Sequence, residues 1–121
     1  MIQIREIDHV VLRVRQLHEV INFYCDVLGC RVEKHQPAIG LTQLRAGSCL
    51  IDLVDVDGEL GRLGGAAPGT EGLNMDHVCL RIDPFDADMI KAHLVDHGVD
   101  CGELQSRYGA EGHGPSFYIT D

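Results

Sequence analysis

The chain carries Ile7-Asp8-His9-Val10-Val11-Leu12-Arg13-Val14 near its beginning and repeats this stretch as Met75-Asp76-His77-Val78-Cys79-Leu80-Arg81-Ile82. The residue types Asp, His, Val, Leu and Arg recur in the same order in the second copy. A segment with helical spacing of apolar residues follows each copy and ends at a glycine, Gly29 or Gly98. The repeat therefore predicts two related halves within one small domain, with a histidine at the equivalent position of each.

Length and charge exclude several classes of function. At 121 residues the chain has the length of one domain, and half of that length would be marginally stable alone. The net charge of −9 argues against a nucleic-acid partner and against an anionic membrane surface. No apolar run reaches the ~18 residues of a membrane span, and the N-terminal residues lack the apolar stretch of a signal peptide. Five cysteines without a CxxC pair are typical of reduced thiols, so we expect a cytoplasmic protein.

The first half, residues 1–57, is predicted to fold as β-α-β-β-β. Residues 7–14 alternate between two faces, with His9, Val11 and Arg13 on one face and apolar residues on the other. An amphipathic helix is predicted over 17–28, where the apolar residues have helical spacing. Further strands are predicted over 31–34, 41–46 and 49–54, and the last two are joined by a hairpin turn at 46–48.

A glycine-rich segment, residues 58–73, is predicted to link the first half to a second half over 74–121. The second half is predicted to begin with a strand over 75–82 and to continue with a helix over 85–97. A polar, glycine-rich loop over 102–114 and a strand over 116–120 follow. The second half breaks off at Asp121, before the counterpart of the fourth strand of the first half.

Asp52 is a third candidate ligand beside the two repeated histidines. It lies between two apolar residues, so strand alternation places it on the kind of face that also carries His9. A buried carboxylate is costly unless it is paired or bound to a metal, and two imidazoles with a carboxylate suit Zn, Ni, Mn, Fe or Co. The alternatives are that the histidines are hydrogen-bonded structural residues and that Asp52 is an edge-strand charge or a partner of Arg13 or Arg81.

The remaining basic residues have simpler interpretations. Arg13 and Arg81 are candidates for binding an anionic group, and the alternative is that they pair with acids or cover the rim of the sheet. The other histidines outside the two repeats and the later loop are expected to be solvated on helix surfaces or loops; they are His18, His35, His93 and His97.

In these features the chain resembles the vicinal oxygen chelate superfamily, which groups glyoxalase I, fosfomycin-resistance proteins, extradiol dioxygenases and bleomycin-resistance proteins. The match covers essentially the whole chain, and the Phe-Tyr…Leu-Gly helix end after a histidine strand is fairly specific to the superfamily but not to one reaction. The residues that carry it are Ile7–Leu12, Phe23-Tyr24 before Val27-Leu28-Gly29, Leu50–Leu53, Asp76–Val78 and Ser116–Asp121.

The resemblance implies an α+β fold in which two tandem βαβββ modules form a cupped mixed sheet with helices outside. It implies a divalent metal ion held by His9 and His77, from the first strand of each module, and by Asp52 from the last strand of module one. Glyoxalase I enzymes carry Glu at that last position, and Asp is one methylene shorter. The fourth ligand, a Glu that is also the base in glyoxalases, would lie past Asp121, so no catalytic base is assigned. A homodimer with the site between modules or subunits is also implied.

The stretch from Arg107 to Gly114 precedes the strand that would border the cup. Its glycines allow close approach of the backbone to a bound molecule, and Tyr108, Glu111 and His113 are candidate substrate contacts. The alternative is an exposed hairpin-like loop with no binding role.

Several functions are compatible with these expectations. The first is a glyoxalase-like lyase or isomerase, in which a metal chelates adjacent oxygens of a small oxygenated substrate and stabilises an oxyanion. A fosfomycin-type thiol transferase and an iron extradiol dioxygenase are enzymatic alternatives. A metal-free drug-binding protein of the bleomycin-resistance kind belongs to another class, and the negative charge suits a cationic drug. An enzyme relic without chemistry is the remaining alternative.

Overall fold

The computed structural model describes all residues from 1 to 121 and has a mixed α+β fold. The chain divides into two compact units, Met1–Val78 and Cys79–Asp121, and each is described by itself. None of the helices is both long and apolar enough to cross a membrane.

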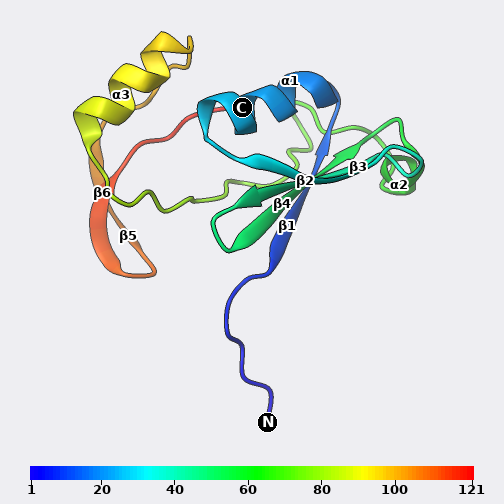
Figure 1. Cartoon of the computed structure of the whole chain (residues 1–121), viewed down its shortest axis with the longest axis horizontal. Coiled ribbons are helices and arrows are strands. Elements are labelled where there is room, and N and C mark those ends of the chain that lie inside the picture. Colours follow the sequence, from blue (N-terminus) through cyan, green and yellow to red (C-terminus); the bar gives the residue numbers. More distant parts are fainter. The chain divides into compact units, whose positions relative to one another are not determined.

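The first unit is built on a four-stranded mixed sheet with the strand order β1-β4-β3-β2 (Figure 1). β1 pairs in parallel with β4, whereas β2 and β4 each pair antiparallel with β3. This β-α-β-β-β order agrees with the prediction for the first half. The elements are β1 (His9–Val14), α1 (Leu17–Asn22), the π-helical turn η1 (Phe23–Val27), β2 (Arg31–Gln36), β3 (Leu41–Ala46), β4 (Cys49–Asp55) and α2 (Glu59–Leu63).

The core of the first unit lies on one face of this sheet. Strand alternation turns every second residue toward it, and the apolar side chains there are almost completely buried, Leu44 and Leu53 fully so. Apolar residues of α1 pack against this cluster, so the helix covers one face of the sheet. The buried cluster consists of Leu12, Val14, Tyr24, Cys30, Leu44, Ile51 and Leu53.

Two local features of the first unit refine the sequence prediction. The hairpin turn between β3 and β4 has Gly47 at a φ of 62°, which suits the two-residue loop Gly47-Ser48 between paired Ala46 and Cys49. The glycine-rich segment contains the short helix α2, which was not predicted. Gly61 in α2 lies so close to the end of β4 that a β-carbon there would be 1.9 Å from the carbonyl oxygen of Asp55.

The strand predicted over 75–82 is not present in the structure, so the tandem arrangement of modules is not confirmed. The first unit supplies a physical reason. There β1 has a single partner, the parallel strand β4, and residues 1–121 contain no strand that takes the place of β4 for the second copy. Without that partner the apolar side chains of the stretch stay in contact with solvent, as Ile82 does with an exposed fraction of 46%.

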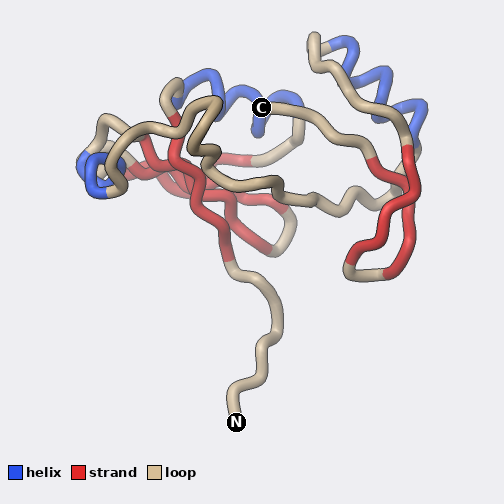
Figure 2. The backbone as a smooth tube through the Cα atoms, turned by 180° about the vertical axis from the view of Figure 1, so that it is seen from behind, coloured by secondary structure: helices blue, strands red, loops and turns tan.

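The second unit consists of helix α3 (Ala87–Asp96) and a hairpin of β5 (Gln105–Gly109) and β6 (Gly112–Ser116), as Figure 2 shows. Asp86 caps α3 by accepting a hydrogen bond from the Met89 amide at 3.1 Å, and Gly98 follows the helix at a φ of 69°.

The predictions for the end of the chain need correction. The loop over 102–114 forms most of the hairpin instead, and the strand predicted over 116–120 has only its first residue in β6. The hairpin gains its stability locally: the Arg107 guanidinium donates to the Ser116 carbonyl at 2.9 Å and to the Ser116 hydroxyl at 2.8 Å. The chain beyond Ser116 has no neighbouring strand, so it forms none.

Candidate functional site

The candidate site lies on the face of the four-stranded sheet opposite the core. In the parallel register His9 stands opposite Leu50, and Val11 stands opposite Asp52. His9 and Asp52 therefore share one face of two neighbouring strands, as the alternation of the sequence predicts. Gln43 of β3 is the residue opposite Asp52 on the other side and joins the same face.

Asp52 is a buried carboxylate with one unsatisfied oxygen. Its side chain lies in the middle of the sheet and the residue has an exposed fraction of 4%. The Gln43 amide nitrogen donates to Asp52 Oδ2 at 3.2 Å, whereas Asp52 Oδ1 is buried and has no hydrogen-bond partner. An orphaned buried acceptor is costly, so its retention marks a place where a cation or a donor is expected to bind.

His9 is oriented by its sequence neighbour. Its Nδ1 lies 2.7 Å from Asp8 Oδ1, and this hydrogen bond raises the pKa of His9 above the usual 6.5. Desolvation opposes the rise, and the negative charges of Asp52 and Asp8 reinforce it. The negative charge of Asp52, on the same sheet face, thus favours the protonated form of the imidazole.

His77 has the same local arrangement as His9. Its Nδ1 lies 2.6 Å from Asp76 Oδ1, close to the distance in the first copy. A carboxylate that accepts a hydrogen bond from Nδ1–H of an imidazole leaves the Nε2 lone pair directed outward. Metal-binding histidines usually have such a partner on the nitrogen that does not bind the metal. The aspartate of the repeated Asp-His pair thus has a chemical role, which is to orient the histidine. This role was not predicted from the sequence, although the aspartate recurs in both copies.

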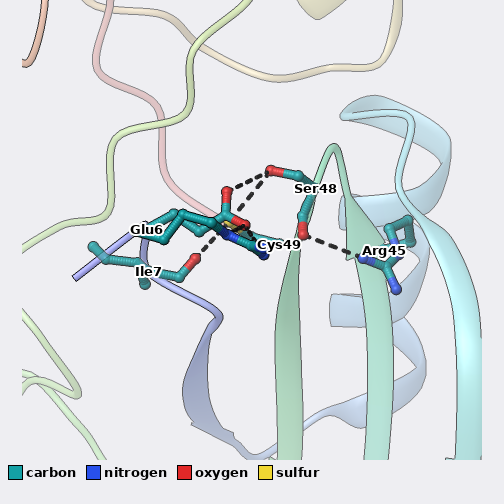
Figure 3. Close-up of polar contacts among 6 residues, drawn as sticks. Glu6, Ile7, Arg45, Ser48 and Cys49 are labelled. Carbon is teal, nitrogen blue, oxygen red and sulfur yellow. Dashed lines mark hydrogen bonds and ion pairs between the residues drawn. The ribbon is translucent and has the colours of Figure 1, made fainter. Parts of the chain in front are cut away.

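The segment before β1 is tied to the β3–β4 hairpin by polar contacts, which Figure 3 shows in close-up. The Cys49 thiol donates to the Ile7 carbonyl at 2.8 Å, and the Ser48 hydroxyl donates to Glu6 Oε2 at 3.3 Å. In addition, the Leu50 amide donates to the Asp8 carbonyl at 3.0 Å. These contacts fix the backbone at Asp8, the residue that orients His9.

The two arginines predicted to contact substrate have internal partners. Arg13 donates to the carbonyl oxygens of Gly61 (3.0 Å), Gly65 (2.7 Å) and Ala66 (3.1 Å), so it holds the glycine-rich segment against β1. Arg81 forms an ion pair with Glu111 in which Nε and Oε2 are 2.7 Å apart. Both contacts agree with the structural alternative for these residues, and a role in substrate binding stays a prediction.

The structure places the loop candidates on the β5–β6 hairpin of the second unit. Tyr108 and His113 face each other across the hairpin, with their ring centroids 5.2 Å apart in an edge-to-face arrangement. Glu111 lies in the turn and pairs with Arg81. The hairpin thus brings together Tyr108 with His113 and Arg81 with Glu111.

Of the three predicted ligands, the structure brings two together on one sheet face. Nowhere in residues 1–121 do three side chains of His, Cys, Asp or Glu gather in a group that could hold a metal ion. His9 and Asp52 do fit a divalent ion as a pair, because one offers an outward Nε2 and the other an unsatisfied carboxylate oxygen. His77 offers a similarly oriented imidazole but is not part of a three-ligand cluster.

The chain is similar to known proteins both in sequence, through a family model, and in fold. The family model described as Glyoxalase/Bleomycin resistance protein/Dioxygenase superfamily matches residues 6–118. No curated protein matches the chain.

Solved structures share the fold over almost the whole chain. An integron cassette protein from the mobile metagenome of V. cholerae is 27% identical with a TM-score of 0.77, covering 100% of this chain and 90% of that chain. TnmS3, an antibiotic-binding protein from a Streptomyces species, is 19% identical with a TM-score of 0.72, covering 100% and 90%. The fosfomycin resistance protein FosX from Listeria monocytogenes, complexed with Mn(II) and sulfate, is 15% identical with a TM-score of 0.69, covering 98% and 83%.

Proposed function

Because the chain belongs to the Glyoxalase/Bleomycin resistance protein/Dioxygenase superfamily, we propose that it is a metal-dependent enzyme acting on a small oxygenated substrate. The divalent ion would be held by His9, Asp52 and His77. The observation that carries this proposal is the buried Asp52 Oδ1, which has no partner on the sheet face that it shares with His9.

The neighbours of each proposed ligand prepare it for this role. Asp8 holds Nδ1 of His9, so the lone pair of Nε2 is available to an ion. Gln43 occupies Oδ2 of Asp52 and leaves Oδ1 for the same ion. Asp76 holds Nδ1 of His77 in the same way as Asp8 holds that of His9. Three polar side chains thus orient the three proposed ligands; they are Asp8, Gln43 and Asp76.

The proposal requires the second copy of the repeat to act as a counterpart of β1. Residues 75–82 would form a strand and turn His77 to the sheet face, as β1 does for His9. This is the tandem arrangement of two modules around a cupped sheet. A homodimer, with sites between modules or subunits, belongs to the same proposal.

A bound divalent ion would supply Lewis acidity, chelating two adjacent oxygens of the substrate and stabilising negative charge as it develops. Within the enzyme class we favour a glyoxalase-like lyase or isomerase, since Asp52 occupies the position of a carboxylate ligand. A fosfomycin-type thiol transferase and an extradiol dioxygenase are the enzymatic alternatives, and the fold likeness to FosX is compatible with the first of these.

A drug-binding protein without metal is the candidate from another class. Two observations favour it: the fold likeness to an antibiotic-binding protein and the net charge of −9, which suits a cationic ligand. The two functions make opposite demands on Asp52. A metal site needs its carboxylate, whereas a drug-binding protein without metal needs no metal ligand.

Titration with Mn²⁺ or Zn²⁺ of protein purified without chelator tests the proposal. We expect wild-type protein to bind one ion per chain at this site and Asp52→Asn to bind it at least ~10-fold more weakly, since the amide is a neutral and weaker ligand. His18→Ala, which removes an exposed histidine of α1, is the matched control and should bind as wild type does. Unchanged affinity in Asp52→Asn would exclude the proposed site.

A further inference from the structure

Helix α3 ends with two histidines four residues apart, His93 and His97, outside the site described above. Both are exposed, whereas Leu94 between them is buried. From the sequence alone, both histidines were expected to be solvated. In the structure the two rings instead have a defined arrangement relative to each other.

The two imidazoles form a close pair. Residues four apart lie on one face of a helix, and the ring centroids of His93 and His97 are 4.4 Å apart with an angle of 45° between the ring planes. Nδ1 of His97 also lies 2.9 Å from the carbonyl oxygen of His93. The second ring is therefore held over the last turn of the helix rather than extended into solvent.

The hydrogen bond to the carbonyl also determines which nitrogen of His97 is available. A carbonyl only accepts, so Nδ1 of His97 must be the donor, and in the neutral ring Nε2 then carries the lone pair. Donation from one ring nitrogen to a backbone carbonyl is the arrangement that orients the other nitrogen of metal-binding histidines. His97 is thus oriented as a ligand, next to a second imidazole.

We propose that His93 and His97 form a second metal site, which binds a divalent first-row transition ion through two imidazole nitrogens. Imidazole suits Cu²⁺, Ni²⁺ and Zn²⁺, and of these Cu²⁺ binds nitrogen ligands most strongly. Two nitrogens at ~2.0 Å from a tetrahedral ion are about 3.3 Å apart. Because imidazole nitrogens lie off the ring centre, two rings with centroids 4.4 Å apart can present nitrogens at this separation.

The surroundings of the pair favour a cation. Asp96 precedes His97 and is three residues after His93, so helix geometry places a carboxylate beside the pair. The C-terminal end of a helix also has partial negative charge. With only two protein ligands, the ion would keep open positions for water or for a donor atom of another molecule.

Nuclear magnetic resonance of the seven histidine side chains, with substoichiometric Cu²⁺ as the probe, tests this site directly. The paramagnetic ion broadens the ring signals of the residues that bind it. We expect His93 and His97 to broaden before His18, which is exposed on α1 and has no histidine four residues away. Broadening of His93 and His97 no stronger than that of His18 would overturn the proposal.

Two variants separate chelation from a role of the pair in capping α3. His93→Ala preserves helix propensity, and His97→Asn suits the end of a helix. Because two ligands on one helix act at high effective concentration, each variant should lose at least ~10-fold in Ni²⁺ affinity at this site, and the double variant should lose little more. Circular dichroism without metal shows whether α3 is retained. If both variants keep α3 and wild-type affinity, the proposal is wrong.

The test also distinguishes this site from the one formed by His9, Asp52 and His77. In His9→Ala the broadening of His93 and His97 should persist, because the proposed α3 site does not use His9 as a ligand. Broadening confined to His9 and His77 in wild-type protein would overturn the α3 site and support the other. Broadening confined to His93 and His97 would support the α3 site and contradict the site formed by His9, Asp52 and His77.

Discussion

Gln43 donates a hydrogen bond of 3.2 Å to one oxygen of Asp52 and leaves the other oxygen of that buried carboxylate without a partner. The two residues are cross-strand neighbours on β3 and β4, so the sheet itself holds the carboxylate in place. A fold that needed only stability would replace such a group with an apolar residue. The half-satisfied carboxylate is therefore the feature that most strongly indicates a binding function for this face of the sheet.

Replacement of Asp52 should separate stability from binding. In metal-free protein, Asp52→Asn removes a buried charge and preserves the shape, so we expect the free energy of unfolding to stay equal or rise by about 1 kcal/mol. Urea denaturation in the presence of chelator measures this change. A loss of more than about 3 kcal/mol would mean that the carboxylate has a structural partner, because breaking a buried charged pair costs this much.

The Asp8–His9 pair predicts a pH dependence. The raised pKa of His9 means that the protonated ring is stabilised in the folded state, mainly by the hydrogen bond that the ring donates to Asp8. This contribution is fully present below the ordinary pKa of 6.5 and is lost as the pH rises through the higher folded-state value. Asp8→Asn should therefore lower the pKa of His9 and destabilise the protein at pH 5.5 more than at pH 9.

Histidine NMR titration and urea denaturation at the two pH values check this prediction. Asp76→Asn is a useful companion variant, since Asp76 holds His77 but does not contact His9. It should leave the pKa of His9 unchanged. An unchanged His9 pKa in Asp8→Asn would show that the neighbouring carboxylate does not raise the pKa of this imidazole.

Gly61 is predicted to tolerate no side chain. A β-carbon there would lie 1.9 Å from the Asp55 carbonyl oxygen and 2.5 Å from the Val56 α-carbon, and backbone atoms cannot rotate away. Gly61→Ala should therefore lower the melting temperature through a displacement that costs about 1–3 kcal/mol. Gly109→Ala is the control, because a β-carbon at that position meets nothing within 4 Å. Equal melting temperatures for the two variants would contradict the close packing of α2 on β4.

The five cysteines should react with a thiol reagent at very different rates. Burial raises the pKa of the Cys30 thiol, and it does the same for Cys25, so both have less of the reactive thiolate. Cys79 is exposed and should be alkylated first. Mass spectrometry after brief iodoacetamide treatment near pH 8 measures the order. Labelling of Cys30 as fast as Cys79 in folded protein would contradict the packing of the core.

The first half of the chain was largely predictable because its signals are local and its partners are all present. The alternation in residues 7–14 placed His9 on the face opposite the core, and the positions of β3 and β4 followed from short apolar runs between turn residues. The shared face of His9 and Asp52 is a direct consequence of the two-residue period of strands.

The second half was less predictable because its local pattern and its available partners conflict. Residues 75–82 have the alternation of a strand, but a strand needs a neighbour, and β1 shows that this neighbour would be a fourth strand. The internal partners of Arg13 could not be predicted either. They depend on how the glycine-rich segment returns to β1. The order of residue types does not show which distant backbone carbonyls will lie beside the arginine.

The proposed function requires that the repeated histidines and Asp52 together hold one divalent ion. Metal analysis of three proteins, each purified without chelator and re-equilibrated with Mn²⁺ or Zn²⁺, tests this requirement. All three carry His93→Ala, which removes the second site on α3, and two of them additionally carry His9→Ala or His77→Ala. We expect one ion per chain in the protein with both repeated histidines, none in the other two, and a similar circular dichroism spectrum for all. Retention of the ion after loss of either histidine, or its absence from the protein that has both, would show that these residues do not form the metal site.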